Sequence, residues 1–95
     1  MDTITTTLKR PFFAAIVDRS KRIEYREIKP YWTLRLGRVK TPFRLILRNG
    51  MRPPVPQLEV RIDKIVRQGR SGVYALHIGR VLRVTHWDQK AKRPK

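Results

Sequence analysis

The sequence contains no cysteine and only two histidines, His77 and His86. Disulfides and thiolate chemistry are therefore excluded, and we expect neither a metal site nor a cofactor, since zinc takes mainly Cys and His ligands. No apolar run approaches the roughly 20 residues that a membrane-spanning helix needs. The first ten residues also lack the basic start and apolar middle of a signal peptide. We therefore expect a cytoplasmic protein without a membrane partner.

Acidic residues are scarce as well. Asp and Glu number 7 against 23 Lys and Arg, which gives a formal net charge of +16. The basic residues run through the whole chain, so the fold itself should be positively charged and should attract polyanions. A basic proteome or a high-salt habitat would explain the same excess without any partner. We favour nucleic acid as the partner, because basic surfaces are the usual footprint of nucleic-acid binders.

Length and hydrophobic spacing predict one small domain. A chain of 95 residues has room for a single core, which we place at residues 1–87, followed by a flexible basic tail at 88–95. Short helices are expected after Pro11 and before Gly37. The expected strands are 3–9, 21–26, 43–48, 58–63, 73–78 and 81–84. Short strands at this spacing predict an α+β fold, a small β-barrel of about five to six strands with one or two short helices.

The stretch KRIEYREIKPYW concentrates the groups that could take part in chemistry. Under the two-residue period of a strand, Glu24 shares a face with Arg22 and Arg26. The proline then turns the chain, which brings Tyr31 and Trp32 beside the end of the strand. Such a face could hold a polar planar ligand, or it could be a salt-bridged surface. The spacing leaves both interpretations open.

Lys21 lies at the joint between the first helix and this strand. A cation there is favoured by the helix dipole, which is a sufficient structural explanation. Strict alternation along a strand places Lys21 on the opposite face from Glu24. It can therefore join Glu24 and Arg26 only if the backbone bends at the joint. Lys9 leaves the first strand near the same end and belongs to the same candidate cluster.

Each residue of the cluster has a functional and a structural interpretation. In a cleft, Lys21 would bind a phosphate or act as a base, and Glu24 would accept hydrogen bonds from a nucleobase or act as a general base. Arg26 would hold Glu24 or grip a phosphate. Tyr31 or Trp32 would stack on a base, which contributes about 1–3 kcal/mol. Structurally, Glu24 could be a surface ion pair worth about 0–1 kcal/mol, and Trp32 could be core.

Two further polar residues have ordinary explanations. His77 lies opposite the apolar face of its strand, so a surface or core role is favoured over catalysis. Asn49 precedes a glycine and is explained as a turn former, although its amide could also face a base.

The helix PFFAAIVDRS followed by K-x-x-E-x-R resembles the ASCH domain family of the PUA-like superfamily, in its small single-domain bacterial and phage form. Lys21, Glu24 and Arg26 fall on the Lys, Glu and Arg of the signature G-x-K-x-x-E-x-R, while Arg19 replaces the glycine. The segments FRLILRNG, YALHIG and PYW are similar to those of the family, so the resemblance covers roughly residues 8–84. It implies a PUA-like β-barrel with a cleft near the signature.

The resemblance also implies a role with RNA or a modified nucleobase. Some relatives are acetylcytidine amidohydrolases that use a Lys, a Thr and a Glu; Lys21 falls on that Lys, but Glu24 occupies the position of the Thr nucleophile. We therefore expect a module that binds single-stranded RNA or a modified nucleotide. The expected contacts are Lys9, Lys21, Glu24, Arg26, Tyr31 and Trp32. The alternatives are a hydrolase of RNA or a nucleoside modification, with Lys21 and Glu24 as acid–base pair, and a basic structural protein that acts through charge alone.

Overall fold

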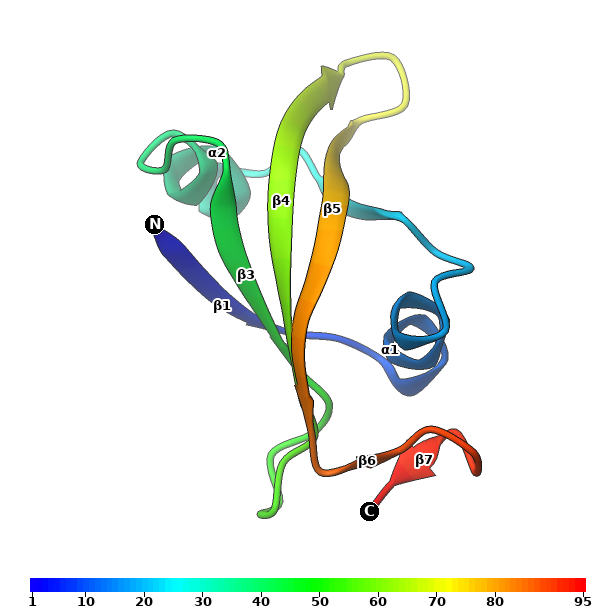
Figure 1. Ribbon diagram of the computed structural model, residues 1–95. Helices are drawn as coiled ribbons and strands as arrows, with labels where there is room; N and C mark the ends of the chain where they lie inside the picture. The colour runs from blue at the N-terminus through cyan, green and yellow to red at the C-terminus, as the bar shows by residue number, and fades with distance from the viewer.

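The computed structural model describes every residue from 1 to 95. Its centre is a five-stranded sheet with the strand order β1-β3-β4-β5-β2 (Figure 1). The helices and strands are β1 (Thr3–Thr7), α1 (Arg10–Val17), β2 (Ile23–Glu27), α2 (Pro30–Leu36), β3 (Phe43–Arg48), β4 (Gln57–Gln68), β5 (Val73–Thr85), β6 (Trp87–Asp88) and β7 (Arg93–Pro94). None of the helices is long and apolar enough to cross a membrane.

The sheet is curled into a half-barrel. β1 pairs in parallel with β3, and β2 pairs antiparallel with β5, so β1 and β2 form the two edges of the sheet. These two edges do not pair with each other. The predicted small α+β fold with a barrel-like sheet is therefore present. The sheet stops as an open half-barrel with a gap between β1 and β2, so it does not form a closed barrel.

Alternation of apolar and polar residues explains why β3 and β4 pair as they do. Leu45 and Leu47 lie opposite Val60 and Leu58, and all four side chains are fully buried. The residues between them face outward, as the pleat of a strand requires. Each strand thus contributes one apolar face to the concave side of the sheet.

β4 and β5 extend beyond their predicted ends, and their pairing with each other is irregular. The register shifts around Asp63 on β4, and around Gly79 and Leu82 on β5. Such bulges interrupt the alternation from which strand ends are predicted. The separate strands expected on either side of Gly79 are one continuous strand. A side chain on Gly79 would overlap the Asp63 carboxylate, which lies across the backbone at this position.

Both helices contribute side chains to the core that fills the concave side of the sheet. Phe13 and Ile16 of α1 and Trp32 and Leu36 of α2 belong to one cluster with the buried strand residues. Both helices have a proline at their first turn, where the missing N–H costs nothing. Pro30 was expected only to turn the chain; it instead begins α2.

The C-terminal residues, which we expected to form a flexible basic tail, contain a short pair of strands. Trp87–Asp88 pairs antiparallel with Arg93–Pro94 to form a small hairpin. The Trp87 ring is buried, and its centroid lies 4.7 Å from that of Phe13 in α1. This contact fastens the hairpin to the core, and the sequence pattern did not indicate it.

Candidate functional site

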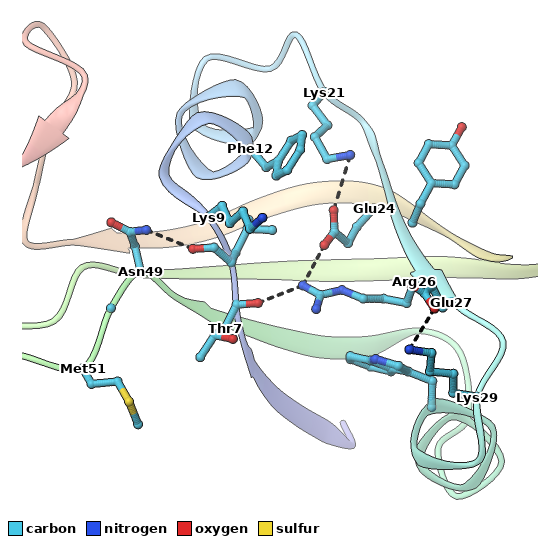
Figure 2. Close-up of a pocket in the computed structure, with 14 residues that line it drawn as sticks. Thr7, Lys9, Phe12, Lys21, Glu24, Arg26, Glu27, Lys29, Asn49 and Met51 are labelled. Atoms are coloured by element: carbon cyan, nitrogen blue, oxygen red, sulfur yellow. Dashed lines mark hydrogen bonds and ion pairs between the residues drawn. The ribbon is translucent and has the colours of Figure 1, made fainter.

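A pocket of about 920 Å³, which we call the main pocket, lies where the half-barrel is open. It is bounded by the end of β1 on one side and by β2 on the other (Figure 2). α1, α2 and the loop after β3 complete its walls. The residues that line it are Thr7, Leu8, Lys9, Phe12, Lys21, Glu24, Tyr25, Arg26, Glu27, Lys29, Trp32, Asn49, Gly50 and Met51.

Glu24 lines the main pocket and is the one buried charged residue of the chain, 4% exposed. Its Oε1 is 3.3 Å from the Lys21 ammonium, and its Oε2 is 2.7 Å from a terminal nitrogen of the Arg26 guanidinium. The structure thus rejects the interpretation of Glu24 as a surface ion pair. Arg22, on the same strand face in the prediction, takes no part in these contacts. We call Lys21, Glu24 and Arg26 the ion-pair cluster.

The turn after α1 explains how Lys21 reaches Glu24, although strand alternation would place the two side chains on opposite faces. Arg19 adopts the left-handed conformation with φ 69°, a geometry that usually favours glycine. The backbone N–H of Lys21 then donates to the Ala15 carbonyl oxygen at 3.0 Å. β2 begins only at Ile23. The bend that the strand pattern required is therefore present, and it is built by a residue other than glycine.

The Lys21 ammonium is held on several sides. Besides Glu24, it donates to the Ile23 carbonyl oxygen at 2.6 Å. It also lies 5.5 Å from the ring centroid of Phe12 and 5.3 Å from that of Tyr25, within the range of cation–π attraction. These contacts fix the position of the positive charge next to the carboxylate.

Arg26 connects the two edges of the open sheet. Its guanidinium donates to the Thr7 carbonyl oxygen at the end of β1 at 2.9 Å, in addition to its ion pair with Glu24. The guanidinium carbon is 5.1 Å from the ring centroid of Trp32. Its Nε is buried without a hydrogen-bond partner. A side chain thus spans the gap that backbone pairing leaves open (Figure 2).

The structure brings five of the six residues expected to bind nucleic acid into the main pocket and leaves out Tyr31. Trp32 lines the pocket, whereas the Tyr31 side chain is 51% exposed and lies outside it. The reason is that Pro30 begins α2, and successive residues of a helix point about 100° apart. The two rings meet in a T-shaped, edge-to-face contact, with centroids 5.5 Å apart, rather than forming one stacking surface.

Several lining residues were not among those predicted. Glu27 and Lys29 form an exposed ion pair of 2.9 Å in the same charged stretch, so its composition could have indicated them. Asn49 donates from its amide to the Leu8 carbonyl oxygen at 2.9 Å and also lines the pocket. Met51 arrives from the loop after β3, and no local sequence signal points to it.

No group of three or more His, Cys, Asp and Glu side chains is arranged to hold a metal ion. Comparison with known proteins found no family model that matches the chain and no curated protein that is significantly similar.

Proposed function

We propose that the chain is an RNA-binding module whose main pocket holds one nucleotide of single-stranded RNA, either standard or modified. The observation that carries this proposal is the ion-pair cluster around the buried Glu24, inside a pocket that is otherwise aromatic and basic. A volume of about 920 Å³ is within the range of small-molecule sites and suits a nucleotide. The lining contains four cations against two carboxylates, so an anionic ligand is favoured.

Glu24 is the group suited to recognise a base. A carboxylate accepts through about four lone-pair positions, and the contacts with Lys21 and Arg26 occupy only part of them. The remaining positions can accept hydrogen bonds from the exocyclic amine or ring N–H of a base. The same two cations fix the direction in which these positions point.

Aromatic side chains can stack on the base, and basic side chains can contact the phosphate. Phe12, Tyr25 and Trp32 line the pocket, and stacking of one base on such a ring contributes about 1–3 kcal/mol. Lys9 and Lys29 are exposed lining residues that can contact a phosphate, Lys29 by exchanging its exposed ion pair with Glu27 for the phosphate. The proposal thus assigns base recognition to the buried part of the pocket and phosphate contact to its exposed lysines.

The resemblance to the ASCH family supports the same assignment. The Lys, Glu and Arg of its signature fall on Lys21, Glu24 and Arg26, which are the three residues of the ion-pair cluster. We therefore propose that the chain is an ASCH-like module of the PUA-like type.

The proposal is tested by fluorescence anisotropy with short single-stranded RNAs over a series of salt concentrations. Lys9→Ala and Lys29→Ala should each weaken binding and reduce the log–log salt slope by about 0.7, the value for one single-strand phosphate contact. Lys64→Ala is the matched control, because Lys64 is also exposed, on β4, and lines no pocket. Salt-independent binding, or an equal loss in all three variants, would refute the pocket and leave charge alone as the explanation.

A second candidate function is hydrolysis of a nucleoside modification or of RNA. It is favoured by the 3.3 Å separation of the Lys21 ammonium and the Glu24 carboxylate, across which a proton could pass. Incubation with a panel of modified nucleosides and short RNAs would reveal a product. Glu24→Gln should abolish product formation, with circular dichroism to verify folding. Wild-type turnover in that variant would exclude Glu24 as a catalytic residue.

A further inference from the structure

A second hollow, which we call the side pocket, lies next to the main pocket along β1. It has a volume of about 380 Å³. Its lining residues are Thr5, Thr6, Thr7, Tyr31, Arg48, Gly50, Met51 and Val55. Thr7, Gly50 and Met51 line both pockets, so the two hollows adjoin at these residues.

The side pocket contains a side chain suited to a base and another suited to a phosphate. Tyr31 offers an aromatic ring that is half exposed, and the guanidinium carbon of Arg35 lies 4.2 Å from its centroid, which restrains the ring. Arg48 is exposed, and its Nε donates to the Gln57 side-chain oxygen at 3.1 Å. This bond orients the guanidinium and leaves its terminal nitrogens to donate to a phosphate.

The edge of β1 adds backbone groups. β1 has a partner strand, β3, on one side only, so alternate residues direct their N–H and C=O groups away from the sheet. The Thr7 carbonyl oxygen points to this open side, since it accepts from Arg26. Thr5, two residues earlier, presents its backbone N–H and C=O on the same side, where they can pair with the edge of a base.

We infer that the side pocket binds the nucleotide adjacent to the one in the main pocket, so that the ligand is an oligonucleotide rather than a free nucleoside. This inference rests on the proposed function. Tyr31 stacks on the second base, and Arg48 contacts the phosphate that joins the two nucleotides as the strand crosses Thr7, Gly50 and Met51. Tyr31, which lies outside the main pocket, thus has a binding role of its own.

The test compares mononucleotides, dinucleotides and tetranucleotides of each of the four RNA bases, by isothermal titration calorimetry. Dinucleotides should bind at least about tenfold more tightly than mononucleotides, because one more base stacks and one more phosphate is contacted. Tyr31→Ala and Arg48→Ala should remove this gain while leaving mononucleotide affinity unchanged. Tyr31→Phe should retain the gain. Arg83→Ala is the control, because Arg83 is an exposed arginine that lines neither pocket.

The outcomes separate this inference from the proposed function. Mononucleotide binding that weakens in Lys9→Ala, combined with equal affinity at every length, would overturn the side pocket and uphold the main pocket. Loss of the dinucleotide gain in Arg83→Ala to the same degree as in Arg48→Ala would also overturn it. Failure of every RNA to bind would overturn the proposed function, and the inference with it.

Discussion

Replacing Glu24 with Gln tests the ion-pair cluster with little change in side-chain size. Gln retains one oxygen acceptor and directs an NH₂ group at the cation that contacted the other oxygen. Either Lys21, at 3.3 Å, or Arg26, at 2.7 Å, therefore loses its anion. Since Glu24 is buried, water replaces the lost contact only in part, so we expect the variant to fold less stably.

The magnitude follows from how deeply the partners are buried. Removing one member of a fully buried ion pair costs about 3–5 kcal/mol. Here the two cationic side chains are 19% and 17% exposed, and each retains a backbone carbonyl, of Ile23 or Thr7, as a second acceptor. We therefore expect a loss of about 2–3 kcal/mol. For a domain of this size that lowers the Tm by roughly 10–20 °C.

Glu27→Gln is the matched control, because Glu27 forms the exposed ion pair of the same stretch. Its side chain is 69% exposed and that of Lys29 is 63% exposed, so the substitution should cost at most about 1 kcal/mol. Urea and thermal unfolding of both variants, followed by circular dichroism at neutral pH, gives the two values. A loss in Glu24→Gln no larger than that in Glu27→Gln would refute the reasoning.

Three further predictions concern stability. Arg19→Gly should raise the free energy of unfolding by roughly 1 kcal/mol, because φ 69° is unfavourable for a residue with a side chain; a lower urea midpoint would contradict this. Trp87→Ala should lower it by about 3 kcal/mol through the lost packing on Phe13; an unchanged midpoint would indicate a mobile tail. Hydrogen bonds from Ser20 lower the pKa of Asp18 below its usual 3.8. The ionised Asp18 therefore stabilises the folded state above about pH 4, and this stabilisation is lost at lower pH. Asp18→Asn should remove that pH dependence from urea unfolding.

Strands whose signal is local could be predicted from the sequence. The apolar residues of β3 alternate without interruption and Asn49-Gly50 ends the strand, so the predicted span 43–48 is also the observed one. The spans of β4 and β5 were underestimated, because the bulges at Asp63 and Gly79 interrupt the alternation. Whether the sheet closes depends on pairing between strands that are distant in the sequence, and no local pattern encodes it.

The candidate site was predictable to a similar extent. The strand period placed Glu24 and Arg26 on one face, and the structure keeps them there as an ion pair. Lys21 required a bend that depends on the left-handed conformation of Arg19, which the residue type does not reveal. Tyr31 was grouped with Trp32 because the two are adjacent in sequence, but a helix directs adjacent side chains apart.

The gap between the edge strands β1 and β2 also has a consequence for the order of folding. β4 and β5 are neighbours in the chain and pair with each other, so their contacts form over short loops. β1 pairs in parallel with β3, across α1, β2 and α2, and such distant pairing is slow. The main pocket therefore assembles late, when β1 reaches the sheet and Arg26 reaches the Thr7 carbonyl oxygen. During refolding, recovery of the proposed RNA binding should lag behind recovery of the β-sheet circular dichroism signal.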